Sequence, residues 1–307
     1  MKKILFYSSL FVIAITFFSC EEEKLGPSII IDEEVSLNAA EQWYYDNFTK
    51  PFNIEVLYKL RDIDADAYDQ DDGSSYGFNI VPADPAKSFA LAQLIKYFWV
   101  GVFEESQGPD FIKANGFRQI QFEGTYRYKA NNVYVLATAS KGIRIVFCGI
   151  NNLSMNNLKD AEYISDRYMR TMYHENTHIL NQKKSYPAAF GNVCGPNYIG
   201  DDWNTRDDTT AYKLGFISSY AGHSSGEDFA EIVSYYVTRR AQWDAVMDWE
   251  SPKINEGGGK TDVEKLTQKL GYVREYLLTA WGIDIDELRR IYEEKAADLE
   301  NFNLLTY

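Results

Sequence analysis

The chain has 307 residues, of which 45% are apolar, enough to bury the core of one large domain or two small ones. Its net charge is −14 and its pI is about 4.8, and no run of lysines and arginines occurs. Because phosphate backbones require a basic surface, this composition argues against a nucleic-acid partner.

Residues 1–19 have the features of an export signal. Lys2 and Lys3 precede an apolar stretch that is short for a membrane span and is followed at once by acidic residues. The stretch ends at Ser19-Cys20, which resembles the processing site of bacterial lipoproteins. The resemblance implies that Cys20 is the lipidated first residue of the mature chain; ordinary secretion with cleavage nearby is the alternative.

The acidic residues that follow Cys20 resemble the surface-export signals of Bacteroidetes lipoproteins. Residues 20–37 are polar and punctuated by Pro and Gly, which is typical of a flexible tether. We therefore expect a lipoprotein of the outer membrane or cell surface, with the lipid anchor as its contact with the membrane.

The pattern of apolar residues predicts the elements that follow, in chain order. A helix (38–48), a strand (52–60), a helix begun by Pro85 (86–104) and three strands (117–122, 132–139 and 143–148) come first. A long helix (157–183), an irregular segment (184–210) and three more helices (226–247, 262–280 and 284–299) complete the chain. This order predicts an α+β fold, with an N-terminal α/β lobe at about 38–183 and a helical lobe at about 184–307.

Two features leave alternatives open. The acidic run 62–73 does not match a calcium-binding EF-hand loop, because its sixth and twelfth positions hold Ala67 and Gly73. We interpret it as a solvated loop, with a looser cation site as the alternative. Cys148 and Cys194 either form a disulfide in an oxidising compartment or remain free thiols.

Two of the three histidines in the chain lie four residues apart, at His174 and His178, with Glu175 between them. On a helix, this spacing places both imidazoles on one face, where they can bind one metal ion. Neutral imidazole is a preferred zinc ligand, so the motif predicts a site for one Zn²⁺ ion, with Glu175 placed to act as a general base.

A catalytic zinc ion needs a third protein ligand and an open position. Asn181 and Lys184 occupy the positions where metzincins have Gly and His, which excludes that class. The remaining candidates for the third ligand lie in the segment Tyr-Ala-Gly-His-Ser-Ser-Gly-Glu-Asp-Phe-Ala-Glu: His223, Glu227, Asp228 and Glu231. Glu227 and Glu231 share one helical face, so one could bind the metal while the other holds a ligand histidine.

The His-Glu-x-x-His pair and the later Tyr-x6-Glu-Asp-Phe-Ala-Glu segment resemble the zincins with a glutamate ligand, or gluzincins. The chain is similar over most of its mature length to the zinc-binding metallopeptidases of Bacteroidetes described as substrate import-associated zinc metallohydrolase lipoproteins. The two motifs alone also resemble those of lethal-factor-like peptidases. These resemblances imply a zincin-like fold in which Glu227 is the third ligand, Glu231 supports the site and Tyr220 stabilises the oxyanion.

Two further roles are hypotheses. His223 lies three residues after Tyr220 and is a candidate for substrate contact, with a metal ligand or a plain surface histidine as alternatives. The strand that contains Ile143 to Phe147 is a candidate edge strand, to which an extended peptide could add as a further strand.

The resulting functional prediction is a surface-anchored zinc metallopeptidase that acts on peptides or proteins. A second hypothesis is an accessory lipoprotein, with little or no catalysis, that binds peptide or glycan for a TonB-dependent nutrient importer. A third retains the zinc chemistry but cleaves amides of cell-wall peptides.

Overall fold

A computed structural model describes residues 37–60, 80–128, 134–135, 137–140, 143–250 and 259–307. The described helices and strands belong to one compact unit, Asn38–Tyr307, which a separate unit, Met1–Leu37, precedes. The predicted signal peptide, Cys20, nearly all of the tether and the acidic run 62–73 lie outside the described residues.

The unit begins with a capped helix. Helix α2 (Ala39–Tyr44) continues through a π-helical turn, η1 (Tyr45–Thr49), into α3 (Lys50–Phe52). Asn38 and Glu41 exchange hydrogen bonds with each other's backbone N–H groups, which satisfies donors at the helix start. The helix ends at Asn53, whose φ is 57°, so strand β1 is confined to Glu55–Leu57 and is shorter than predicted.

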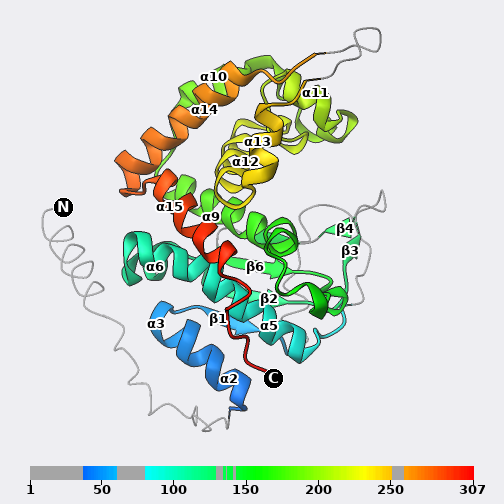
Figure 1. Cartoon of the computed structure of the whole chain (residues 1–307), viewed down its shortest axis with the longest axis vertical. Coiled ribbons are helices and arrows are strands. Elements are labelled where there is room, and N and C mark those ends of the chain that lie inside the picture. Colours follow the sequence, from blue (N-terminus) through cyan, green and yellow to red (C-terminus); the bar gives the residue numbers. More distant parts are fainter. Residues whose placement is uncertain (1–36, 61–79, 129–133, 136, 141–142, 251–258) are drawn as a thin grey trace, which may run out of the picture. The chain divides into compact units, whose positions relative to one another are not determined.

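A mixed sheet lies beneath the predicted metal-binding helix (Figure 1). Strands β1, β2 (Gln119–Phe122) and β6 (Arg144–Phe147) are parallel, and β5 (Ala137–Ser140) is antiparallel to β6, giving the order β1-β2-β6-β5. A separate antiparallel ladder joins β3 (Arg127–Tyr128) to β4 (Tyr134–Val135).

The hypothesis that Ile143 to Phe147 form an edge strand is wrong. Strand β6 pairs with β2 on one side and with β5 on the other, so its backbone groups already have partners along both edges. Among the strands that the structure describes, β5 and β1 end this sheet. An extended peptide could therefore add to the described sheet only beside one of those two strands.

The helical segment from Pro85 to Gln107 fills the core beside the sheet. It comprises α5 (Pro85–Ile95), a π-helical turn, η2 (Lys96–Val100), and α6 (Gly101–Gln107), and is followed by α7 (Pro109–Asn115). Apolar residues cover almost every face of this segment, and Phe98 and Trp99 are fully buried. Such all-round burial is typical of a central helix rather than of a surface helix.

The predicted long helix is confirmed from Ala161 onward. Asp160 caps α8 (Ala161–Ile164), which continues through a π-helical turn, η5 (Ser165–Met169), into α9 (Arg170–Lys183), the helix with both histidines. Residues 157–160, the first turn of the predicted helix, are not α-helical: Asn157 ends a 3-10 turn that begins at Met155, and Asp160 is the cap of α8.

The C-terminal part contains no described strand and is built from helices. These are α10 (Ala188–Cys194), α11 (Asp208–Lys213), α12 (Ser225–Thr238), α13 (Arg240–Met247), α14 (Val263–Tyr276), which continues as a π-helical turn η10 (Leu277–Trp281), and α15 (Ile285–Ala297). Two sequence predictions need correction here. The segment 184–210 contains α10 and two 3-10 turns, and the helix predicted at 226–247 breaks at Arg239, whose φ of −131° and ψ of 55° are not helical.

The α+β prediction, with a small mixed sheet and a mostly helical C-terminal part, is confirmed, whereas the boundary between two lobes stays a prediction.

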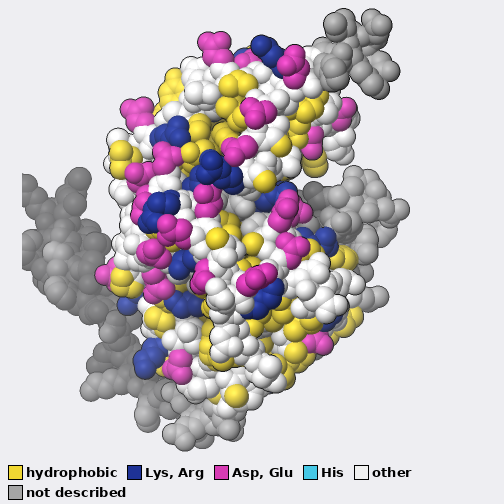
Figure 2. Space-filling view, viewed as in Figure 1, with side chains coloured by type: hydrophobic (Ala, Val, Ile, Leu, Met, Phe, Trp, Pro, Cys, Tyr) yellow, Lys and Arg dark blue, Asp and Glu magenta, His cyan; other side chains and the backbone are white. Residues whose placement is uncertain are grey.

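Cys148 and Cys194 are both buried and free, so they do not form a disulfide. Among the described helices, none is long and apolar enough to span a bilayer. Figure 2 shows acidic and basic side chains lying beside one another on the face that carries α15, where Arg290 pairs with Glu287 and Glu294.

Candidate metal centre

The back of α9 holds the helix in place so that its histidines face α12. Asn176, between the two histidines in sequence, is 1% exposed. Its side-chain oxygen accepts a hydrogen bond from Trp99 Nε1 at 3.1 Å, and its amide nitrogen donates to the carbonyl of Asn115 at 3.1 Å. Thr177 donates to the carbonyl of Tyr173 at 2.7 Å. The two positions of the motif between Glu175 and His178 are therefore fixed in the core.

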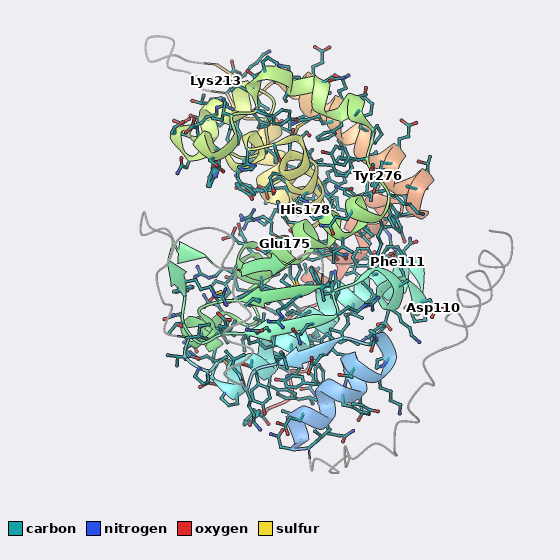
Figure 3. The ribbon with its side chains drawn as sticks, turned by 180° about the vertical axis from the view of Figure 1, so that it is seen from behind. Asp110, Phe111, Glu175, His178, Lys213 and Tyr276 are labelled. Carbon is teal, nitrogen blue, oxygen red and sulfur yellow. The ribbon has the colours of Figure 1, made fainter. Side chains whose placement is uncertain are left out.

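The side chains of His174, His178 and Glu227 converge at one point, although His174 and Glu227 are 53 residues apart in the sequence. Glu227 Oε2 lies 2.9 Å from His174 Nε2 and 3.2 Å from His178 Nε2, and the two histidine nitrogens are 3.1 Å apart. Within the described residues, these three form a cluster suited to a metal ion. Figure 3 shows Glu175 and His178 on α9, between the sheet and the helices that follow it in the chain.

The spacing of these three atoms fits zinc. Ligands bonded to zinc at 2.0–2.1 Å in a tetrahedron lie about 3.3 Å apart, close to the separations in the cluster. The side chains of His178 and Glu227 are 24% and 20% exposed, so a solvent molecule can approach a fourth position. Two imidazoles and one carboxylate match the donor set of a catalytic zinc site.

Glu231 determines which nitrogen of His174 is available for a metal ion. Its Oε1 lies 2.9 Å from His174 Nδ1, and an ionised carboxylate can only accept a hydrogen bond. Nδ1 must therefore carry the hydrogen, and in the neutral ring Nε2 presents its lone pair to the cluster. The lone pairs of His174 and His178 then face a carboxylate, an arrangement that a cation stabilises.

Three residues hold Glu231 in its ionised form. Burial opposes ionisation, but the Arg170 guanidinium at 3.1 Å and the hydrogen bond to His174 lower the pKa of Glu231 to about 2. Ser218 donates a further hydrogen bond to Oε2 at 2.6 Å. Glu231 itself is 1% exposed, so these three donors replace the water that it loses on folding.

The cluster has a strong preference for positive charge. Burial opposes protonation of His174, but the hydrogen bonds to Glu227 and Glu231 raise its pKa to about 10. Burial likewise opposes ionisation of Glu227, yet the two histidines hold its pKa well below the usual range. A proton and a divalent cation are alternative means of supplying that charge.

Glu175 differs from Glu227, the candidate carboxylate ligand, in its position and in the direction of its pKa shift. It is half-buried on α9, and burial raises its pKa, although the adjacent His174 and His178 oppose this effect. A carboxyl with a raised pKa is a better proton acceptor than a free carboxylate, which suits a general base.

Tyr220 and His223 lie beside the cluster in different ways. The ring of Tyr220, in a 3-10 turn at Tyr220–Gly222, is 5.9 Å from that of His174, and burial and the nearby Glu227 raise its pKa. The phenol thus keeps its proton and can donate a hydrogen bond. The ring of His223 lies 6.0 Å from that of Tyr220, and its Nε2 is 3.3 Å from Asp201, so it pairs away from the ligands.

The structure therefore brings Glu227, Glu231 and Tyr220 to the histidine pair, and their roles as ligand, supporting residue and oxyanion donor stay predictions. Sequence reasoning missed Arg170 and Ser218. Arg170 lies four residues before His174, a helical spacing that could have indicated it. No local pattern distinguishes Ser218.

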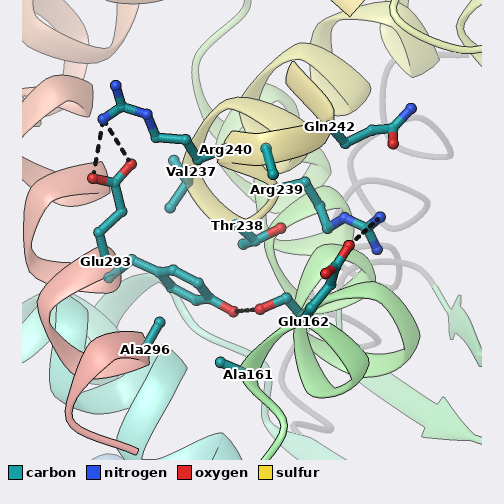
Figure 4. Close-up of a pocket in the computed structure, with 12 residues that line it drawn as sticks. Ala161, Glu162, Val237, Thr238, Arg239, Arg240, Gln242, Glu293 and Ala296 are labelled. Carbon is teal, nitrogen blue, oxygen red and sulfur yellow. Dashed lines mark hydrogen bonds and ion pairs between the residues drawn. The ribbon is translucent and has the colours of Figure 1, made fainter. Parts of the chain in front are cut away.

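A separate cavity of about 170 Å³ lies where α12 meets α13 (Figure 4). Arg239 and Arg240 line it together with residues of α8 and α15, and Ser165 and Tyr292 are hydrogen-bonded across it at 2.5 Å. None of the cluster residues lines this cavity. Arg240 pairs with Glu293 at 3.2 Å, so its charge is already neutralised.

A small mixed sheet, a helix with two histidines and a glutamate from a second helix together define the class: an α+β protein with an HExxH-type metal site. The model of the family described as "Putative zinc-binding metallo-peptidase" matches residues 33–286, and the chain belongs to this family.

A solved structure supports this assignment. The crystal structure of a "putative zinc-binding metallo-peptidase" from Bacteroides caccae is similar to this chain, with 27% sequence identity and a TM-score of 0.68. The match covers 86% of this chain and 94% of that chain. Among curated proteins, none matches at a significant level.

Proposed function

We propose that this protein is a zinc-dependent metallopeptidase of the gluzincin type, with His174, His178 and Glu227 as ligands of one zinc ion. The observation that carries the proposal is the convergence of these three side chains within 2.9–3.2 Å beside a carboxyl, Glu175, with a raised pKa. A protein that only bound peptides would have no use for a general base at that place.

The chain's own residues supply proton transfer and charge stabilisation. A bound zinc ion would lower the pKa of a water molecule and polarise the scissile carbonyl. Glu175 accepts the proton of the attacking water and later delivers it to the leaving amine. Tyr220 donates a hydrogen bond to the oxygen on which negative charge develops, an interaction whose removal costs about 3 kcal/mol.

We also propose that the protein acts outside the cytoplasm, anchored through Cys20 at the outer membrane or cell surface. The support comes from the sequence: a short apolar segment after Lys2 and Lys3, ending at Ser19-Cys20. Mass spectrometry of the membrane fraction tests this, because a diacylglyceryl modification of Cys20 is lost in a Cys20→Ala variant. An unmodified, soluble wild-type chain would overturn the anchor.

The central experiment is zinc analysis and peptide-library profiling of residues 20–307, with Cys20→Ala to avoid lipidation. We expect one zinc ion per chain, cleavage that a chelator abolishes and zinc restores, and no cleavage by Glu175→Gln with its zinc retained. Glu287→Gln, a change in an exposed acid on α15, is the control. Undiminished zinc content in Glu227→Ala would refute the ligand assignment.

The same experiment separates the alternatives. Zinc bound stoichiometrically without cleavage of any peptide would favour a binding role in nutrient import, with a TonB-dependent transporter as partner. Cleavage of cell-wall peptides in preference to protein-derived peptides would indicate an amidase.

A further inference from the structure

Three carboxylates project from the first two turns of α12, and each has its own partners. Glu227 faces the two histidines and Glu231 faces His174 and Arg170. Asp228 faces a different neighbour, α14, where both of its oxygens accept from Lys269 Nζ at 2.7 and 2.8 Å. The side chains of Asp228 and Lys269 are both 0% exposed.

A third group completes this buried arrangement. The hydroxyl of Tyr198 donates to Asp228 Oδ2 at 2.8 Å. The residues after Tyr198 are hydrogen-bonded to the segment that carries the predicted oxyanion donor: Ile199 N–H donates to the carbonyl of Gly222 at 2.9 Å, and Gly200 N–H to that of His223 at 3.1 Å. Asp228 is thus a junction between α14, the start of α12 and the turn that begins at Tyr220.

The position of Asp228 on α12 allows it to affect the orientation of the proposed metal ligand Glu227. Asp228 directly follows Glu227, so the two lie at the same level of α12, about 100° apart around its axis. A side-chain atom about 5 Å from the axis moves by about 1 Å when the helix rotates by about 12°. Glu231 is one turn further along, so it holds the second turn rather than the first.

The energetics favour a role in orientation over one in stability. A fully buried ion pair loses its hydration, and replacing such a pair by apolar side chains is often neutral or stabilising. Its geometry, in contrast, is strict, because both oxygens of Asp228 are occupied and Lys269 Nζ also lies 4.8 Å from the ring of Phe216.

We propose that Lys269 and Tyr198 are positioning residues for the metal centre. By holding Asp228, they fix the first turn of α12, and with it the direction in which Glu227 points toward His174 and His178. Through Tyr198 they also set the distance between that turn and the segment that carries Tyr220. This inference rests on the proposed function, because it assigns a purpose to the metal ligand.

The test is the zinc dissociation constant of purified variants, measured by competition with a chelating indicator at 20 °C and pH 7. Asp228→Asn combined with Lys269→Met removes both charges together, so no unpaired charge remains buried. We expect it to bind zinc about 10-fold or more weakly than wild type while remaining folded by circular dichroism, as for residues that orient metal ligands. Lys265→Met is the matched control, since Lys265 is on the same helix and its partner, Asp262, is outside the cluster.

Tyr198→Phe keeps the test decisive where the double variant does not fold, because it deletes one hydroxyl and no charge. We expect kcat at saturating zinc to fall about 5-fold or more with KM little changed, an effect that lower stability alone would not produce in the folded protein. Zinc affinity and kcat within twofold of the Lys265→Met control would overturn the inference.

The outcome also separates this inference from the proposed function. If wild type binds zinc and Glu227→Ala does not, while the Asp228 and Tyr198 variants behave like the control, only the positioning role fails. If wild type binds no zinc, the proposed metallopeptidase fails with it.

Discussion

Glu231→Gln is the sharpest test of how the site prepares His174 for a metal ion. The carboxylate accepts from His174 Nδ1, from Arg170 and from Ser218, and it is almost fully buried. Glutamine has the same shape and can keep its oxygen toward Nδ1 and Arg170, with its amide nitrogen toward Ser218. The substitution therefore retains the tautomer of His174 and removes only the negative charge.

The expected loss of zinc affinity depends on which interactions each variant of Glu231 retains. Residues that hold ligand histidines contribute about 10-fold to 100-fold to metal affinity, or about 1.4–2.8 kcal/mol. Glu231→Gln keeps the acceptor and should lie near the lower limit. Glu231→Ala loses the acceptor as well and should lie near the upper limit.

The assay is zinc competition with a chelating indicator at pH 7, with unfolding followed in parallel. Glu123→Gln is the control, because Glu123 is equally buried, is paired with Arg127 and lies outside the cluster. If Glu231→Gln bound zinc within twofold of wild type, the argument that the charge of Glu231 strengthens zinc binding would be refuted. The same result for Glu231→Ala would refute the argument that Glu231 sets the tautomer of His174.

Four other predictions concern the pH dependence of zinc affinity, the stability of the metal-free protein, Tyr220 and the two buried cysteines. Because the pKa of His174 is raised to about 10, zinc must displace a proton from the ring below that pH. The apparent zinc affinity should therefore rise about 10-fold per pH unit between pH 6 and 8. A zinc affinity that does not change with pH would show that the ring is already neutral. By the same linkage, the stabilisation of the metal-free protein by that proton is complete below pH 6.5 and is lost as the pH rises toward 10. Tyr220→Phe should lower kcat about 100-fold at unchanged zinc affinity, and an equal loss of zinc would assign Tyr220 to the metal instead. Cys148 and Cys194, both 2% exposed, should resist alkylation in the native protein and react in denaturant, whereas reaction of either in the native protein would contradict their burial.

The sequence was sufficient for the parts of the site that depend on helical periodicity. His174 and His178 share a helical face because of their spacing, and Glu227 and Glu231 do so for the same reason. The capped starts of α8 and α12 also follow local rules, since Asp160 and Ser224 accept from the helix N–H groups three residues on.

The rest depends on pairing between distant segments, which no local pattern records. The alternating residues of 143–148 predict a strand but not its neighbours, so β6 was misplaced at the edge of the sheet. The ion pair of Asp228 and Lys269 joins residues 41 apart, and nothing in the sequence of α14 distinguishes Lys269 from Lys265 or indicates its partner. The break at Arg239 has no local signal either, because neither a glycine nor a proline lies at residues 237–241.

The π-helical turn η5 (Ser165–Met169), directly before α9, has a consequence for how the family can vary. A π-helical turn holds one residue more than an α-helical turn of the same length, and the N–H of Arg170 donates to the carbonyl of Ser165, five residues back. A homologue that lacks one residue here could close the turn into a regular α-helix while the faces of α8 and α9 keep their directions. The evolution of this segment could therefore include a single deletion that leaves the histidine pair facing α12, whereas a deletion between Arg170 and His174 would rotate the two histidines by about 100° relative to the preceding helix.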